Sequence, residues 1–203
     1  MKKLMMGFLA LVMLPLAALA NQFEEGKHYE VIKMAAPSAQ PMVTEYFSFL
    51  CPHCYRFEPF IKELKGQLPE GVKLQKNHVD FMGREMGVEL SRAWAVMELL
   101  GVEEQVASKL FASIHVQRQI PKSRDDIRNI FVAAGVKGED FDAAVNSFSI
   151  NGRLSQMQRN TLNNEVHGVP TLIINGKYKV NTGSVSSKEE LFELVNWLAK
   201  KDA

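Results

Sequence analysis

The chain has 203 residues, of which 46% are hydrophobic and 23% are charged, and its formal net charge is +1 at pH 7. A hydrophobic fraction of this size supplies a folded core, which excludes a disordered or fibrous chain. No segment gathers Lys and Arg in the way that a nucleic-acid surface requires. We therefore expect a globular domain that has no nucleic acid among its partners.

The first twenty residues have the pattern of a cleaved export signal. Lys2-Lys3 precedes an apolar stretch from Leu4 to Leu16, and Ala18-Leu19-Ala20 matches the small-x-small site of a signal peptidase. The apolar stretch is shorter than the roughly 20 residues that a membrane-spanning helix needs. We therefore predict that residues 1–20 form a signal peptide that is removed after Ala20, and that the remaining chain is exported.

Apolar, aromatic and β-branched runs predict five strands in the rest of the chain. The predicted strands are Tyr29–Ile32, Met42–Phe49, Val72–Val79, Leu172–Ile174 and Tyr178–Val180. The last two strands flank Asn175-Gly176, a dipeptide that is typical of a two-residue β-hairpin turn.

Helical periodicity is found between and after these strands. Helices are predicted directly after Cys54 and at Val88–Leu100, Glu104–Val116, Asp126–Ala134, Phe141–Ser149 and Lys188–Lys200. Ser123 and Asp126 have the spacing of a capping box, and Gly101, Gly135 and Gly152 are predicted helix stops. Because no convincing strand occurs between Gly83 and about Asn164, the pattern predicts an α/β domain with a helical insert.

Cys51 and Cys54 are the only cysteines of the chain, in the motif Cys51-Pro52-His53-Cys54. A structural disulfide is one interpretation, but closing so short a loop contributes only about 2 kcal/mol. A structural zinc site is another, but such sites need four nitrogen or sulfur ligands and the chain has no second cysteine pair. A redox-active dithiol is the interpretation that the spacing favours over these two.

The dithiol is predicted to lie where a strand gives way to a helix. Cys51 then occupies or adjoins the helix N-cap, and Pro52 lies in the first turn, where proline is tolerated. Unpaired N–H groups and the helix dipole favour a thiolate there, and His53 can add positive charge or a hydrogen bond. Cys54 is expected to be more shielded and to keep a higher pKa, so that Cys51 attacks or is attacked in thiol exchange and Cys54 is the resolving thiol.

These motifs resemble those of the DsbA family of bacterial periplasmic thiol:disulfide oxidoreductases. The resemblance is carried by the Cys51–Cys54 motif after Phe47-Ser48-Phe49-Leu50, by Gly168-Val169-Pro170 and by the signal peptide. It implies a thioredoxin-like fold with an inserted helical domain. The thioredoxin-like part would comprise residues 21–82 and 165–203, and the helical insertion residues 83–164.

The resemblance also implies roles for residues outside the motif. Pro170 is expected to form a cis bond with Val169 against the dithiol, which leaves the Val169 backbone free to pair with a client. An ordinary trans proline at a strand start is the alternative. Phe57 and Ile61 are expected to line an apolar groove for unfolded chains.

A carboxyl group in the strand before the dithiol is implied to handle protons. Glu45 interrupts an apolar run, and the resemblance makes it a buried acid beneath the dithiol, paired with Lys76. Burial would raise its pKa and allow it to exchange a proton with Cys54. A place on a solvated face or a sheet edge is the alternative for Glu45.

The implied function is that of a periplasmic dithiol oxidase. Its redox-active disulfide, Cys51–Cys54, would be donated to reduced, unfolded exported proteins, with no other cofactor and no metal. A quinone-linked inner-membrane oxidase of the DsbB type would regenerate the disulfide, and we expect a monomer. The alternatives are a periplasmic disulfide isomerase or reductase, and a non-enzymatic peptide-binding module.

Overall fold

The computed structural model describes residues 22–33 and 37–201, so the predicted signal peptide lies outside the described residues. The strands are β1 (Tyr29–Val31), β2 (Met42–Phe47), β3 (Lys73–His78), β4 (Thr171–Ile174) and β5 (Tyr178–Val180). The helices are α1 (Pro52–Gln67), α2 (Glu85–Leu100), α3 (Glu103–His115), α4 (Arg124–Ala133), α5 (Gly138–Val145), α6 (Phe148–Asn163) and α7 (Lys188–Lys200), with a 3₁₀ turn at Thr182–Ser184.

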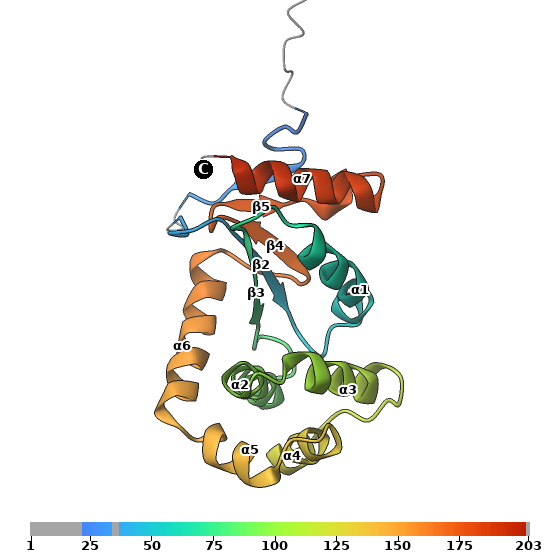
Figure 1. The fold of residues 1–203 in the computed structure, drawn as a ribbon, viewed down its shortest axis with the longest axis vertical. Coiled ribbons are helices and arrows are strands. Elements are labelled where there is room, and N and C mark those ends of the chain that lie inside the picture. Colours follow the sequence, from blue (N-terminus) through green and yellow to red (C-terminus); the bar gives the residue numbers. More distant parts are fainter. Residues whose placement is uncertain (1–21, 34–36, 202–203) are drawn as a thin grey trace, which may run out of the picture.

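The strands form one mixed sheet in the order β1-β5-β4-β2-β3 (Figure 1). β2 and β3 are parallel, and the other neighbours are antiparallel. The hairpin between β4 and β5 turns at Asn175 and Gly176, whose φ angles of 54° and 65° suit these two residue types. Ile174 pairs with Tyr178, so the loop also contains Lys177 and is one residue longer than the two-residue turn that we predicted.

Helices cover both faces of the sheet (Figure 1). α1 and α7 share one apolar core with the sheet, and Val43 of β2 belongs to it. Because side chains alternate along a strand, Glu45 points to the same face as Val43, toward α1. Tyr46 points to the opposite face, where its hydroxyl oxygen accepts a hydrogen bond of 2.8 Å from Asn164 Nδ2, just after α6.

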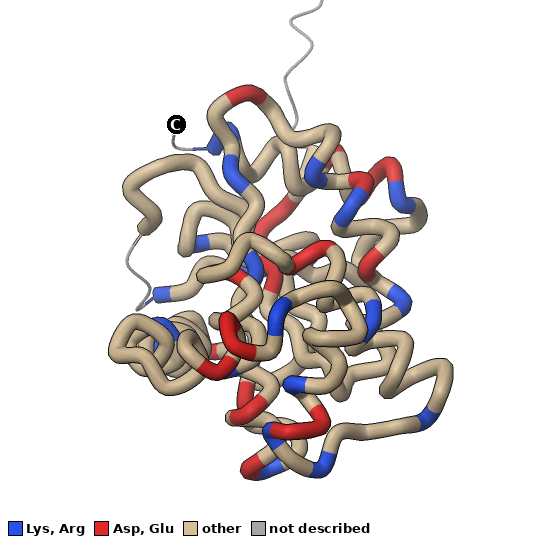
Figure 2. Tube along the Cα trace, turned by 60° about the horizontal axis from the view of Figure 1, so that its bottom comes forward, with Lys and Arg blue, Asp and Glu red and all other residues tan. Residues whose placement is uncertain are grey.

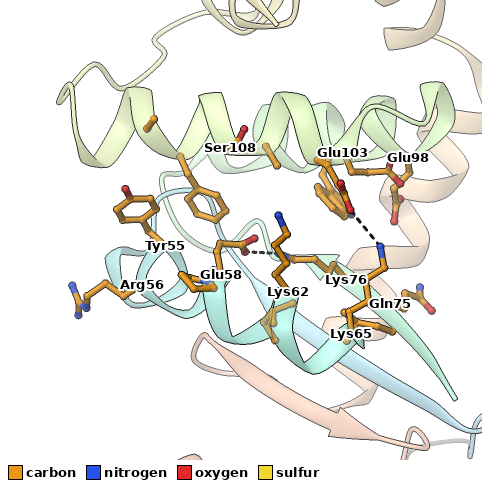
Figure 3. A pocket seen from close by; sticks show the side chains of 18 residues that line it. Tyr55, Arg56, Glu58, Lys62, Lys65, Gln75, Lys76, Glu98, Glu103 and Ser108 are labelled. Atoms are coloured by element: carbon orange, nitrogen blue, oxygen red, sulfur yellow. Dashed lines mark hydrogen bonds and ion pairs between the residues drawn. The ribbon is translucent and has the colours of Figure 1, made fainter. Parts of the chain in front are cut away.

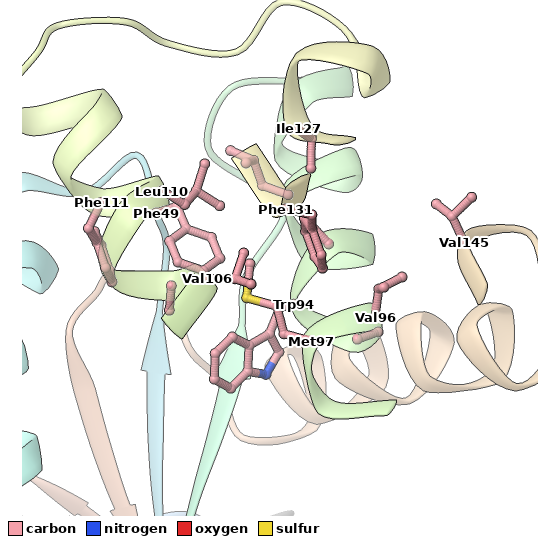
Figure 4. Packing of buried hydrophobic residues seen from close by; sticks show 14 of the residues in the cluster. Phe49, Trp94, Val96, Met97, Val106, Leu110, Phe111, Ile127, Phe131 and Val145 are labelled. Atoms are coloured by element: carbon pink, nitrogen blue, oxygen red, sulfur yellow. The ribbon is translucent and has the colours of Figure 1, made fainter. Parts of the chain in front are cut away.

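The helices α2 to α6 separate β3 from β4 in sequence and form the helical insertion, as predicted (Figure 1). They pack around a second apolar core, in which Trp94 and Met97 of α2 lie near Leu110 of α3 (Figure 4). The same core includes both cysteines. The dithiol therefore lies where the insertion packs against the thioredoxin-like part, and its surroundings are built by both.

Local signals predicted several helix ends correctly and two incorrectly. The capping box of Ser123 and Asp126 is present, and Gly101 and Gly135 end helices with φ angles of 66° and 91°. The predicted helix at residues 141–149 coincides with α5 up to Val145, but its C-terminal end is wrong, and so is the predicted stop at Gly152. The chain breaks earlier, at Ser147, whose hydroxyl oxygen caps α6 by accepting the Ile150 N–H, and Gly152 lies exposed inside α6.

Charged residues of both signs are interspersed along the described chain (Figure 2). Among the helices of the described residues, none is long and apolar enough to cross a membrane.

The core of the insertion gives a test with an internal control. Phe131 is fully buried and packs on Phe141 with ring centroids 4.7 Å apart, whereas Phe148 is 92% exposed. We expect Phe131→Ala to lower the free energy of unfolding by about 3 to 5 kcal/mol, because it removes buried surface and leaves a cavity. Phe148→Ala is expected to change it by less than about 0.5 kcal/mol. Urea unfolding measures both, and equal losses in the two variants would contradict this packing.

Candidate active site

Cys51 is the N-cap residue of α1, as predicted. Its backbone is extended, with φ −90° and ψ 115°, and Pro52 occupies the first turn. The sulfur accepts a hydrogen bond of 3.3 Å from the backbone N–H of Cys54. Both this donor and the positive end of the helix dipole favour negative charge on the sulfur.

The two cysteines have different surroundings and are not joined by a disulfide in this structure. Cys51 is 4% exposed and Cys54 is completely buried. Burial raises the pKa of the Cys54 thiol, and a hydrogen bond with Cys51 and the charges of Cys51 and Glu45 raise it further, against a hydrogen bond with the Ser48 backbone. Cys54 is therefore the shielded, high-pKa thiol that the sequence predicted.

The loop before β4 lies against the dithiol. The Val169–Pro170 peptide bond is cis, in agreement with the prediction, and the Cys51 thiol donates a hydrogen bond of 3.4 Å to the Val169 carbonyl oxygen. The ladder between β2 and β4 ends where Tyr46 pairs with Thr171. Val169 thus lies beside the reactive sulfur and just outside the ladder.

A buried acid lies on the α1 side of the sheet. Glu45 and Lys76 are register partners of the parallel strands β2 and β3, and Lys76 Nζ lies 3.0 Å from Glu45 Oε2. Glu45 has no exposed side-chain surface, and its Oε1 finds no hydrogen-bond partner among the described residues. Burial raises the pKa of Glu45 to about 7, against the charge of Lys76 and assisted by that of Glu58. The solvated position considered for Glu45 is excluded.

A cavity of about 860 Å³ lies beside Lys76, the ion-pair partner of this acid (Figure 3). It lies between α1, β3, α2 and α3, and Lys76 and Glu58 line it. Lys76 binds both Glu58 and the buried Glu45. Lys76 therefore links Glu58, which lines the cavity, to the buried carboxyl group of Glu45.

Three other predicted site residues, His53, Phe57 and Ile61, form no hydrogen bond with either sulfur within the described residues. His53 is exposed, and its Nδ1 accepts a hydrogen bond of 3.0 Å from Arg56 Nη2; no hydrogen bond within the described residues joins His53 to Cys51. Phe57 is half-buried and stacks on Phe60 with centroids 4.6 Å apart. Ile61 is only 3% exposed and therefore offers a client almost no surface.

Two histidines for which no role was predicted contact the backbone of Phe49, two residues before Cys51. His78 ends β3, and its Nε2 accepts the Phe49 N–H at 3.0 Å. Burial, together with the charge of Lys76, lowers the pKa of His78 to about 3, so its ring stays neutral. His115 comes from α3, and its Nε2 donates to the Phe49 carbonyl oxygen at 2.8 Å. No local pattern marks His115, because its contact depends on how the insertion packs.

The chain matches known proteins over nearly its whole length. Residues 42–193 match the family model of the DSBA-like thioredoxin domain. The chain is 40% identical to the thiol:disulfide interchange protein DsbA of Escherichia coli K12, over 99% of this chain and all of that protein. It is 43% identical to the protein of the same name from Salmonella typhimurium, over 95% of this chain and 93% of that one.

Solved structures agree in fold. A variant of Proteus mirabilis DsbA with a non-covalently bound peptide PWATCDS aligns with a TM-score of 0.81 at 40% identity, over 87% of this chain and 98% of that one. A variant of Pseudomonas aeruginosa DsbA aligns with a TM-score of 0.82 at 30% identity, over 89% and 98%. The chain therefore belongs to the DsbA family of thiol:disulfide interchange proteins, has the thioredoxin-like fold with a helical insertion, and is a disulfide oxidoreductase.

Proposed function

We propose that this protein is a periplasmic dithiol oxidase that donates a Cys51–Cys54 disulfide to reduced, newly exported proteins. The observation that carries the proposal is the asymmetry of the two sulfurs. Cys51 accepts an N–H at the start of α1, whereas Cys54 is completely buried and its thiol has a raised pKa. A site of this kind favours the dithiol over the disulfide, and it therefore makes the disulfide a strong oxidant.

The exchange begins with the oxidised protein. A client thiolate attacks Cys51 Sγ, the Cys51–Cys54 bond breaks, and a mixed disulfide forms between the client and Cys51. Cys54 leaves with the electron pair and takes up a proton. A second client thiolate then attacks the client sulfur of the mixed disulfide, and Cys51 leaves as a thiolate. The client has lost two electrons to form its disulfide, and the protein has gained them.

The leaving step requires a proton at Cys54, because a thiol with a raised pKa is a poor anionic leaving group. Glu45 is suited to supply it, since its charge acts on Cys54 and its own pKa of about 7 allows both protonation states near neutrality. Lys76 and Glu58, which line the cavity, would return the proton from solvent.

Client binding would use the loop that contains the cis proline. The Val169 backbone lies beside Cys51 and outside the ladder of β2 and β4, so an extended client segment can pair with it. The relative with a bound PWATCDS peptide supports this, because that peptide contains a cysteine. Phe57 would supply apolar contact to the client segment. It belongs to a row of stacked rings, because it stacks on Phe60, which in turn stacks on Phe192 of α7.

The reduced protein then needs an electron acceptor. We infer a quinone-linked inner-membrane oxidase of the DsbB type, with the Cys51–Cys54 pair as the only redox group of a monomeric protein. The predicted signal peptide and the DsbA relatives support the periplasm as the location. Pro52 and His53 would tune Cys51 from the first turn of α1. A disulfide isomerase remains the second candidate.

The proposed exchange can be tested with a reduced peptide that contains two cysteines. The oxidised wild-type protein should convert it to its disulfide, and Cys51→Ser should leave only the uncatalysed rate, because the attacked sulfur is gone. Cys54→Ser should accumulate a mixed disulfide through Cys51, which mass spectrometry detects. A Cys51→Ser variant that still oxidises the peptide would contradict the proposal. Faster refolding of scrambled ribonuclease than oxidation of the peptide would favour the isomerase.

The buried acid predicts a specific pH dependence of stability. The pKa of Glu45 is about 7 in the folded protein against 4.5 as its ordinary value, so the folded state binds the proton more tightly. The stability that this contributes is fully present below pH 4.5 and is lost as the pH rises through 7. The change in the free energy of unfolding caused by Glu45→Gln should therefore be more favourable at pH 8 than at pH 4.5, by up to about 3 kcal/mol. Chemical unfolding at the two pH values measures this, and an effect that does not depend on pH would refute it.

A further inference from the structure

Two histidines hold the backbone N–H and carbonyl groups of Phe49, two residues before Cys51. Its N–H donates to His78 Nε2 at 3.0 Å, and its carbonyl oxygen accepts from His115 Nε2 at 2.8 Å. His78 comes from the end of β3 and His115 from the end of α3. The thioredoxin-like part and the helical insertion thus each hold one backbone group of the same residue.

His115 also contacts the other flank of the dithiol. Its ring stacks on that of Tyr55, with centroids 5.1 Å apart and planes 11° apart. Tyr55 directly follows Cys54 in α1, and Figure 3 shows its ring in the space between α1 and α3. One side chain of the insertion therefore touches the segment before Cys51 and the segment after Cys54.

Phe49 belongs to the turn that sets the positions of the Cys51 and Cys54 sulfurs. The Cys51 N–H donates to the Ser48 carbonyl oxygen at 3.0 Å, and the Ser48 backbone forms a hydrogen bond with the Cys54 thiol. A shift of Phe49 would move Ser48 on one side and Cys51 on the other. Phe49 itself packs beside Leu110 and Phe111 of α3 (Figure 4), so the turn is bound to the helix that carries His115.

The two histidines differ in what each can do. His78 is buried, stays neutral and has its other nitrogen, Nδ1, 2.7 Å from Ser91 Oγ. It is fixed from within the core, on the side of the turn that faces the sheet. His115 is half-buried, and its bond depends on the position of α3. Without it, the Phe49 carbonyl would lose a partner at the side of the turn that faces the insertion.

We propose that His115 is a positioning residue through which the helical insertion sets the redox equilibrium of the dithiol. By holding the Phe49 carbonyl, it keeps Cys51 Sγ within reach of the Cys54 N–H at the start of α1. That contact favours the reduced form, so loss of the His115 hydrogen bond makes the disulfide a weaker oxidant. The inference rests on the proposed exchange at Cys51 and Cys54, and it adds a residue outside the motif that controls it.

Two substitutions separate the hydrogen bond of His115 from its ring stacking. His115→Phe keeps an aromatic ring against Tyr55 and removes the donor, whereas His115→Gln removes the ring and offers an amide N–H to Phe49. Val116→Ala, at the next residue and 62% exposed, is the matched control. The readout is the equilibrium constant of the Cys51–Cys54 pair with reduced and oxidised glutathione at one pH, with thermal unfolding of the reduced form measured in parallel.

We expect His115→Phe to shift this equilibrium toward the disulfide by roughly threefold to tenfold, which is the range for the loss of one hydrogen bond. His115→Gln and Val116→Ala should stay within about twofold of the wild type. If His115→Phe lowers only the unfolding temperature and leaves the equilibrium unchanged, or if His115→Gln shifts the equilibrium as far as His115→Phe, the inference is wrong. If the wild-type pair itself is no more oxidising than glutathione, it is the proposed function that fails.

Discussion

The chemistry of this protein depends on one contact, the hydrogen bond from the Cys54 N–H to Cys51 Sγ at the first turn of α1. The same turn that begins the helix places one sulfur at its N-terminus and buries the other against the insertion. Two thiols of the same kind thereby acquire different properties. One is held where negative charge is favoured, and the other is held where charge is costly.

The sheet supplies a buried carboxyl group whose charge acts on the buried sulfur, and in the proposed mechanism this group is the proton donor. Parallel pairing of β2 and β3 places Glu45 opposite Lys76, and strand alternation turns Glu45 toward α1. Burial then brings its pKa to about 7, in the range where a group both gives and takes protons under neutral conditions. The helical insertion closes the site from the other side, through its core around the cysteines and through His115.

The sequence predicted those parts of the fold and of the site that depend on residues close together in the chain. The N-cap at Cys51, the capping box at Ser123 and the hairpin at Asn175 follow from local backbone chemistry. The helix stop predicted at Gly152 is wrong because an exposed glycine destabilises a helix by only about 1 kcal/mol, which the packing of α6 overcomes. His115 and the burial of Ile61 were not predictable, because both depend on how segments distant in sequence pack together. The places of Glu45, Lys76 and Pro170 were inferred from the family resemblance.

The most direct test of the account compares the thermal unfolding of the oxidised and the reduced protein. A disulfide that closes so short a loop would ordinarily add about 2 kcal/mol of stability through the unfolded chain. We predict the opposite order, with the reduced form unfolding at the higher temperature, because the contact at Cys51 stabilises the dithiol. An oxidised form that unfolds at the same or a higher temperature would contradict it.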